Sequence, residues 1–203
     1  MTVAPASAHR RDEYLQAARL AIDPDRVELA LDLTPGIAIA GRVLAEIDRD
    51  GDNVIALDEA RAYTHRLISG IALDVDGHPL EIELADAVFP AVAAIFEGEG
   101  TVRIVARAAL PELGAGVHRL RYRNAHRPDI SAYLANALVP AGDRISIRSQ
   151  QRDPVQRNLT IEYVLRPDAA TRLRHGLGVA AAVTVLWLTV LWRRRAAPTA
   201  APP

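Results

Sequence analysis

VELALDL, residues Val27 to Leu33, alternates apolar residues with Glu28, Ala30 and Asp32. Because successive side chains of a β-strand point to opposite faces, this period of two predicts a strand with one buried face. Similar short stretches recur, with Pro, Gly or Asp between them: residues 71–75, 80–84, 101–108, 117–123, 130–139, 144–149 and 158–165. Short strands at near-regular spacing are typical of a β-sandwich, so we expect a mainly β, sandwich-like domain over residues 9–165.

Two of these stretches indicate more than a strand. Asp76-Gly77 lies between residues 71–75 and 80–84, and Asp-Gly favours the two-residue turn of a β-hairpin because both turn positions need φ > 0. In the stretch 117–123, Leu120 and Tyr122 alternate with three arginines. That alternation predicts one buried and one solvated face.

One part of the chain departs from the β pattern and is predicted to be helical, over residues 35–47 and 57–71. Pro35 is placed to open the first helix, because proline is favoured at the first helical position. In the second helix four apolar residues fall near 3.6-residue spacing: Leu57, Ala60, Leu67 and Ile68. We therefore expect a helix–loop–helix insert over residues 35–71.

The segment between these helices, residues 48–59, reads DRDGDNVIALDE and carries the one chemical motif in the sequence. Calcium takes six to eight oxygen ligands, and a twelve-residue loop supplies them from positions 1, 3, 5, 7 and 12. These positions hold Asp48, Asp50, Asp52, Val54 (through its backbone carbonyl) and Glu59 (as a bidentate carboxylate). Ala56, at position 9, leaves its ligand to water. The motif predicts a Ca²⁺ site, and the alternative is an acidic, solvated turn between two helices.

DRDGDNVIALDE resembles the EF-hand loop at nearly every constrained position. Position 6 is usually Gly because the backbone there is left-handed, and Asn53 is the next best residue for that conformation. Ile55, at position 8, is expected to pack the loop onto its neighbours, whereas Ala60 is a weak substitute for the large apolar residue that usually follows the loop. EF-hands normally work in pairs, but Asp74-Val-Asp76-Gly77 lacks the later ligands. A single loop with water at one vertex should bind weakly, on the order of 10⁻⁴ to 10⁻³ M.

Composition argues against several classes of function. A formal net charge of −1 argues against nucleic acid as a partner, and the absence of cysteine excludes zinc–thiolate sites, iron–sulfur clusters and cysteine nucleophiles. The histidines form no pair with metal-ligand spacing, and neither a phosphate loop nor a nucleophile elbow is present. His126, Asp129 and Ser131 lie close in sequence, which a loop explains better than a catalytic triad. We therefore expect no enzymatic activity.

Residues 176–192 read GLGVAAAVTVLWLTVLW, without a charge, and three arginines follow at once. A helix of that length spans about 25 Å, the lower end of a bilayer crossing. The final Trp and the arginines are typical of a membrane boundary, whereas a buried core helix is the alternative. We predict a single transmembrane helix in contact with lipid, between a juxtamembrane link at 166–175 and a basic tail at 193–203. Gly178 and Ala182 form a small-x-x-x-small pair, which would permit a homodimer.

Residues 1–8 read MTVAPASA, and the A-x-A tripeptide Ala6-Ser7-Ala8 is of the type that signal peptidase cuts after. The basic and apolar regions that should precede it are missing, so we interpret residues 1–8 as a signal-peptide remnant, with an unstructured leader as the alternative. Export, together with a weak calcium loop, predicts that the main domain lies outside the cytoplasm. The opposite arrangement is a tail-anchored protein whose domain is cytoplasmic.

A second resemblance covers most of the chain. The order HRRDEYLQA, strand, helix, calcium loop, LDVDG hairpin and HRLRYRN looks like the extracytoplasmic β-domains of some bacterial membrane proteins. In part of that group a similar domain precedes a nickel or cobalt permease segment of the HupE/UreJ type, whereas here a single predicted anchor helix stands in its place. The resemblance implies an exported domain, suggests a membrane-protein partner and carries no catalytic residues. We expect a membrane-anchored, extracytoplasmic, calcium-binding structural or interaction module. The alternative is an accessory protein of a nickel/cobalt-type transporter or of metalloenzyme maturation.

Overall fold

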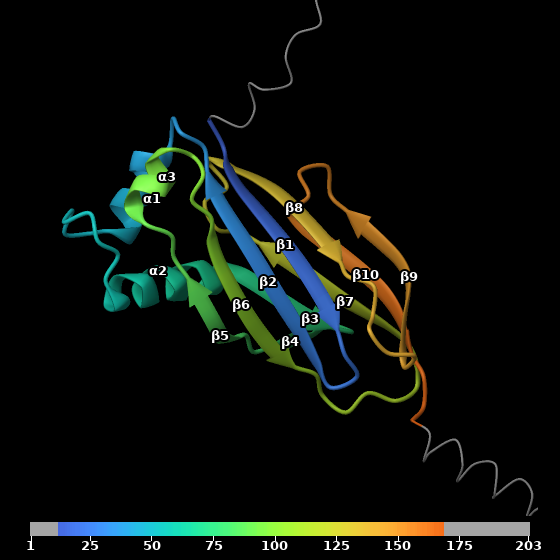
Figure 1. Ribbon diagram of the computed structural model, residues 1–203. Coiled ribbons are helices and arrows are strands. Elements are labelled where there is room, and N and C mark those ends of the chain that lie inside the picture. The colour runs from blue at the N-terminus through green and yellow to red at the C-terminus, as the bar shows by residue number, and fades with distance from the viewer. Residues whose placement is uncertain (1–11, 169–203) are drawn as a thin grey trace, which may run out of the picture. The chain divides into compact units, whose positions relative to one another are not determined.

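Two five-stranded sheets make up most of the part of the chain that the computed structural model describes, residues 12–168 (Figure 1). The first sheet has the order β5-β6-β2-β1-β8 and the second the order β4-β3-β7-β10-β9. The bounds in the first sheet are β1 (Tyr14–Ile22), β2 (Arg26–Pro35), β5 (Glu83–Val88), β6 (Val102–Ala109) and β8 (Ser131–Ala137). Those in the second are β3 (Ile71–Val75), β4 (His78–Leu80), β7 (Gly116–Asn124), β9 (Ile145–Arg152) and β10 (Asn158–Leu165). The prediction of a mainly β domain is confirmed.

Alternation along each strand decides which side chains are buried. In β1 and β2 every second residue is buried, and the two strands pair antiparallel with Leu20 opposite Leu29. The inward side chains of both sheets, such as Leu29 and Ile161, belong to one aliphatic core. In β7 the prediction for Leu120 and Tyr122 is confirmed: both are buried, and the arginines between them are exposed.

A buried polar network connects the two sheets. The Gln16 side chain, from β1, donates to the His126 carbonyl at 2.9 Å and accepts a hydrogen bond from Asn124 of β7 at 2.8 Å. The Tyr133 hydroxyl, from β8, donates to the same carbonyl at 2.8 Å. Because a buried polar group without a partner costs free energy, these bonds allow Gln16 and Asn124 to lie in the core.

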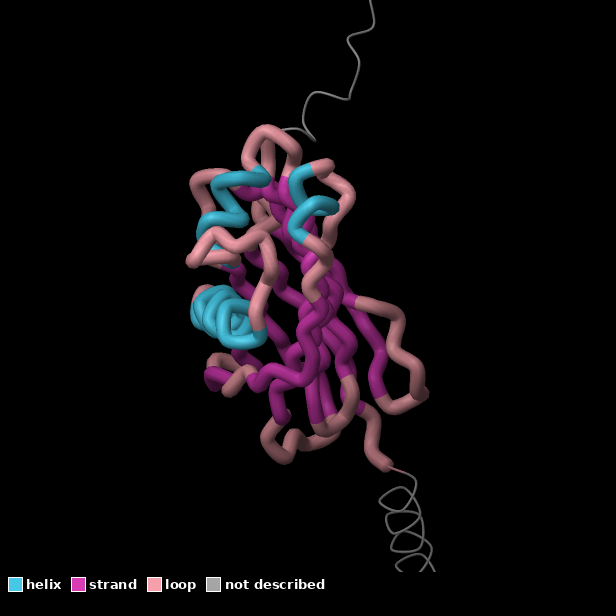
Figure 2. Tube along the Cα trace, turned by 60° about the vertical axis from the view of Figure 1, so that its left-hand side comes forward, coloured by secondary structure: helices cyan, strands magenta, loops and turns pink. Residues whose placement is uncertain are grey.

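The three helices of the described residues lie to one side of the strands (Figures 1 and 2). They are α1 (Ala40–Ile47), α2 (Leu57–Ser69) and α3 (Val92–Phe96). The first predicted helix begins later than expected, because Pro35 ends β2 opposite Tyr14, a strand-end position that proline tolerates. In α2 the buried residues are Glu59, Tyr63, Thr64 and Leu67. The predicted apolar face was therefore partly wrong, since Leu57 is 66 % exposed.

The hairpin between β3 and β4 has the predicted two-residue turn. Val75 pairs with His78, and both turn residues have positive φ, 52° for Asp76 and 88° for Gly77. The second strand was wrongly placed at 80–84, since β4 ends at Leu80 and β5 begins at Glu83 in the other sheet. Strand β1 and helix α3 were not predicted.

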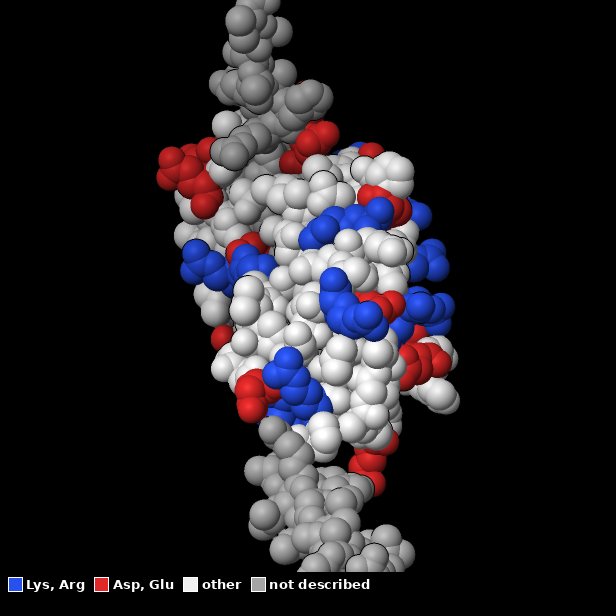
Figure 3. All heavy atoms as spheres, turned by 90° about the vertical axis from the view of Figure 1, so that its right-hand side faces the viewer, with Lys and Arg blue, Asp and Glu red and all other residues white. Residues whose placement is uncertain are grey.

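Among residues 12–168, no helix has the length and apolar character that a membrane crossing requires. The predicted anchor at 176–192, the tail at 193–203 and the signal-peptide remnant at 1–8 lie outside the described residues, as does most of the link at 166–175. On the face seen in Figure 3, basic groups lie beside acidic groups, with uncharged surface between them. Among the described residues, ion pairs such as Arg19–Asp32, at 2.7 Å, bring basic and acidic side chains together.

Candidate metal centre

Three aspartates converge in the loop between α1 and α2. One carboxylate oxygen of each of Asp48, Asp50 and Asp52 lies within 4.8 Å of the corresponding oxygens of the other two. Asp48 is buried and the other two are exposed, so the cluster opens to solvent on one side. These three are the first three of the five ligands that the sequence predicts.

Hydrogen bonds within the loop hold these carboxylates in place. Asp48 follows α1 directly and accepts from the backbone N–H of Gly51 at 2.8 Å and of Asn53 at 3.0 Å. Asp50 accepts from the N–H of Asp52 at 3.1 Å, and Asp52 from that of Val54 at 2.7 Å. Each carboxylate is therefore oriented by the backbone of the loop itself.

The backbone turns sharply at two loop residues. Gly51 has φ 73° and Asn53 has φ 65°, in the left-handed region that favours glycine and tolerates asparagine. The expectation that Asn53 would adopt this conformation is confirmed. The two turns bring the N–H groups of Gly51 and Asn53 back to the Asp48 side chain.

Glu59, the predicted bidentate ligand, lies in the first turn of α2 and is not part of the aspartate cluster. Its Oε1 accepts from the N–H of Arg49 at 2.6 Å and, more weakly, from that of Asp50 at 3.4 Å, and its Oε2 accepts from the N–H of Ala56 at 3.1 Å. Glu59 is buried, with 8 % of the residue exposed, and its carboxylate connects the start of the loop to its end. Val54 is exposed, and its N–H bonds to Asp52.

No basic side chain of the described residues forms an ion pair with any of the three aspartates. Two like charges 4 Å apart repel by about 1 kcal/mol in water and by about 4 kcal/mol near a protein surface. The loop therefore holds three negative charges close together, and the hydrogen bonds that they accept come from backbone N–H groups of the loop. A cation bound among them would remove this repulsion.

Apolar contacts attach the loop to the rest of the domain. Ile55 packs against the main core and also against a smaller cluster formed by α1 and α3, whose members are Ala40, Leu44, Val92 and Ile95. The expectation that Ile55 packs the loop onto its neighbours is confirmed. The short helix α3 gives α1 an apolar neighbour, and this contact was not predicted from the sequence.

Helix α2 is connected to the sheets by a cluster of buried aromatic side chains. The Tyr63 hydroxyl lies 2.5 Å from that of Tyr14 in β1 and 3.2 Å from His126 Nε2. Burial, with a smaller contribution from the Arg66 charge, lowers the pKa of His126 to about 4, so the ring is neutral at pH 7. Tyr63 lies four residues after Glu59, so the loop and this cluster share one helix. Sequence reasoning missed the cluster because its members lie far apart in the chain.

His126, Asp129 and Ser131 do not form a catalytic arrangement. The Ser131 hydroxyl accepts a hydrogen bond from Gln16 at 2.6 Å, and Asp129 pairs with Arg42 at 2.7 Å and with Arg127 at 3.1 Å. His126 instead faces Tyr63. All three residues fasten the segment between β7 and β8 to its surroundings.

No protein-family model matches this chain, and neither a curated protein nor a solved structure shows significant similarity to it.

Proposed function

We propose that this chain is a membrane-anchored, extracytoplasmic module that binds one calcium ion in the loop 48–59. The observation that carries the proposal is the convergence of Asp48, Asp50 and Asp52 within 4.8 Å, without a basic side chain of the described residues to neutralise them. In the EF-hand arrangement, Val54 would add a backbone carbonyl and Glu59 a bidentate carboxylate.

The donor set favours calcium over the other ions considered. All the proposed ligands are oxygens, which suit hard cations, whereas imidazole and thiolate donors suit nickel and cobalt better. Asp50 and Asp52 are exposed, so water molecules can complete a variable coordination shell around a bound ion. Calcium tolerates such variable coordination, whereas magnesium demands a near-ideal octahedron.

The proposed role is structural or interaction-based. Bound calcium would fix the loop between α1 and α2, and α2 leads through Tyr63 into the buried cluster with Tyr14. The expected affinity, on the order of 10⁻⁴ to 10⁻³ M, is useful only where calcium is near millimolar, which supports an extracytoplasmic location. The anchor at 176–192 remains a prediction from the sequence.

Thermal unfolding of the full-length protein in detergent tests the proposal. If Kd lies between 10⁻⁴ and 10⁻³ M, 10 mM calcium should stabilise the domain by about 1.4–2.7 kcal/mol, because only the folded state binds. Magnesium at the same concentration should stabilise it much less, and nickel should show no preference for this loop. Before the titration, a chelator removes any calcium that the protein retained from purification.

Glu59→Gln and Asp58→Asn provide a matched pair of variants. Both remove one negative charge from the first turn of α2, but only Glu59 is a proposed ligand. Glu59→Gln should abolish the calcium-dependent rise in Tm, whereas Asp58→Asn should retain it. An unchanged Tm for the chelator-treated wild-type protein would refute the calcium assignment.

A further inference from the structure

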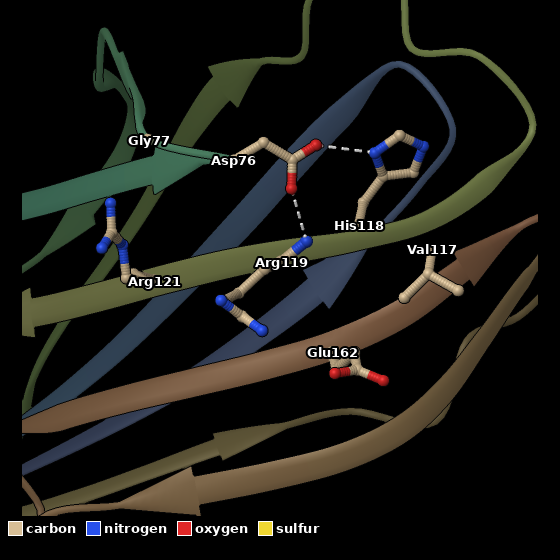
Figure 4. Close-up of a pocket in the computed structure, with 7 residues that line it drawn as sticks. All are labelled: Asp76, Gly77, Val117, His118, Arg119, Arg121 and Glu162. Carbon is tan, nitrogen blue, oxygen red and sulfur yellow. Dashed lines mark hydrogen bonds and ion pairs between the residues drawn. The ribbon is translucent and has the colours of Figure 1, made fainter.

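His118 connects two chain segments at the end of the sheets opposite α1. It lies in β7, and its Nδ1 is 2.7 Å from Asp76 Oδ2, in the turn between β3 and β4. Its Nε2 is 2.7 Å from the Gly114 carbonyl oxygen, in the segment 110–115 that joins β6 to β7. Figure 4 shows the Asp76 carboxylate between the His118 ring and the backbone N–H of Arg119, which donates to Asp76 Oδ1 at 2.8 Å.

Both partners of the His118 ring can only accept a hydrogen bond. A neutral imidazole has one N–H, whereas the imidazolium has two, so only the protonated ring satisfies both contacts. Burial opposes the charge, but the hydrogen bond to Asp76 and that to the Gly114 carbonyl outweigh it and raise the pKa of His118 above 6.5. The pKa of Asp76 is lowered: burial opposes ionisation, but the bonds from His118 and the Arg119 N–H outweigh it.

The charges around this contact are largely balanced by other pairs. Arg121 is held by Asp74 at 2.9 Å, and Glu162 by Arg148 at 3.3 Å. Tyr163 lies beside the His118 ring, with the ring centroids 5.7 Å apart. The remaining charged or titratable groups near the contact are Arg119 in β7, His78 in β4, Glu81 directly after β4 and Glu112 in the segment 110–115. Asp76 is the one carboxylate of the described residues that touches the His118 side chain.

The segment held by His118 also forms one wall of an apolar groove. Leu110 and Leu113 line this groove from one side, and Pro79 and Leu80 of the β3–β4 hairpin line it from the other. Asp76 belongs to the hairpin, and Gly114 directly follows Leu113 of the opposite wall, so His118 connects the two segments that line the groove. Leu110 is also held at the base of its segment, since its N–H donates to the Asp25 carbonyl at 2.8 Å.

We propose that His118 holds the segment 110–115 in place only when its ring is protonated. The imidazolium donates hydrogen bonds to Asp76 and to the Gly114 carbonyl. Loss of one proton releases the segment and widens the groove. A neutral ring keeps one hydrogen bond and turns a lone pair toward the other acceptor. The sign follows from the raised pKa. The bridge stabilises the segment fully below the ordinary pKa of histidine, and this stabilisation is lost as the pH rises through the His118 pKa.

NMR of the full-length protein in detergent, with ¹⁵N-labelled histidine, gives the protonation state of His118 directly. His126 serves as an internal control: its pKa, about 4, lies below the ordinary value of histidine, whereas the pKa of His118 should lie above it. Asp76→Asn should lower the pKa of His118, since it removes the carboxylate charge. Asp153→Asn is the matched control: Asp153 lies in the turn between β9 and β10 and is held by Asn158, and its replacement should leave the pKa of His118 unchanged.

Amide hydrogen exchange measures the release of the segment. After correction for intrinsic exchange rates, the protection of the Leu110 amide should fall as the pH rises from below 6.5 to above the His118 pKa. The fall should be roughly tenfold for each unit by which that pKa exceeds 6.5. The Leu138 amide, which donates to the Leu20 carbonyl at 2.8 Å, should keep its protection over the same pH range. A His118 pKa at or below 6.5 would overturn the proposal, and so would Leu110 protection that stays constant while His118 titrates.

Discussion

Two Asp-x-Asp-Gly sequences occur in this chain, and they have opposite electrostatic surroundings. At 48–51 the aspartates converge with Asp52, and no basic side chain of the described residues pairs with them. At 74–77 each aspartate has a basic partner, since Asp74 pairs with Arg121 at 2.9 Å and Asp76 with His118 at 2.7 Å. The same four-residue pattern thus serves as a candidate cation site in one place and as a hairpin turn in the other.

The difference lies in what surrounds each turn. At 74–77 the neighbouring strand β7 pairs with β3 and places Arg121 opposite Asp74. At 48–51 the neighbours are the backbone of the loop itself and the apolar residues of α1 and α3. Carboxylates that already have a protein cation gain little from a metal ion, whereas carboxylates that lack one gain the most. A motif therefore predicts a metal site only together with the charges that face it.

The largest expected effect is a loss of stability at acidic pH, caused by the buried His126 beside α2. The pKa of His126 is near 4 in the folded protein, whereas that of histidine in the unfolded chain is about 6.5. As the pH falls, the unfolded chain therefore binds the proton first. The free energy of unfolding should fall by about 1.4 kcal/mol per pH unit between pH 6.5 and 4. Urea denaturation at several pH values measures this slope. His126→Gln should flatten it, whereas the exposed control His65→Gln should not. An equal slope in the wild-type protein and in His126→Gln would contradict the buried, neutral histidine.

The next effect distinguishes the two Asp-x-Asp-Gly turns by calcium affinity. Asp50→Asn removes a proposed ligand charge and should weaken calcium binding at least about tenfold, or about 1.4 kcal/mol. Asp74→Asn removes the corresponding aspartate of the other turn and should leave the affinity unchanged. Isothermal titration calorimetry of the full-length variants provides the comparison. Similar losses in both variants would indicate a general effect of surface charge.

The smallest expected effect concerns the ion pair of the second turn. Arg121→Gln frees Asp74, but the Arg121 side chain is 54 % exposed, so unfolding should become easier by less than about 1 kcal/mol. Chemical denaturation checks the size of this change. The variant should gain no calcium site, because the segment after Gly77 enters β4 and supplies no later ligands. A new calcium site at 74–77 would contradict this expectation. It would show that Arg121, and not the lack of later ligands, keeps calcium from binding at the second turn.

Periodicity predicted the strands well where the apolar residues themselves alternate cleanly along the sequence. The stretches 71–75 and 158–165 match β3 and β10 residue for residue, and the Asp76-Gly77 turn follows from local conformational preference. Strand β1 was missed because the buried positions of YLQAARLAI include the polar Gln16, and because small alanines occupy both buried and half-buried positions. Gln16 is buried only because Asn124 and His126 satisfy it, a contact between residues more than 100 positions apart.

The candidate site was predictable to the extent that its ligands are local. Asp48, Asp50 and Asp52 converge because the loop bends at Gly51 and Asn53, which short-range sequence preferences already indicate. The hydrogen bonds of Glu59 to Arg49 and Ala56, and the contact of Ile55 with α3, depend on tertiary packing. No local pattern encodes them. The opposite surroundings of the two turns likewise depend on which strand pairs with β3.

A calcium titration followed by amide NMR of the full-length protein tests the central claim most directly, because each turn has its own glycine signal. Gly51 and Asn53 donate to Asp48 in the proposed calcium loop, whereas Gly77 donates to Asp74 in the hairpin turn. We predict that millimolar calcium shifts the Gly51 and Asn53 signals in a saturable way and leaves that of Gly77 in place. Signals of Gly51 and Asn53 that stay fixed in the chelator-treated protein, or a shift of Gly77 equal to theirs, would contradict the account.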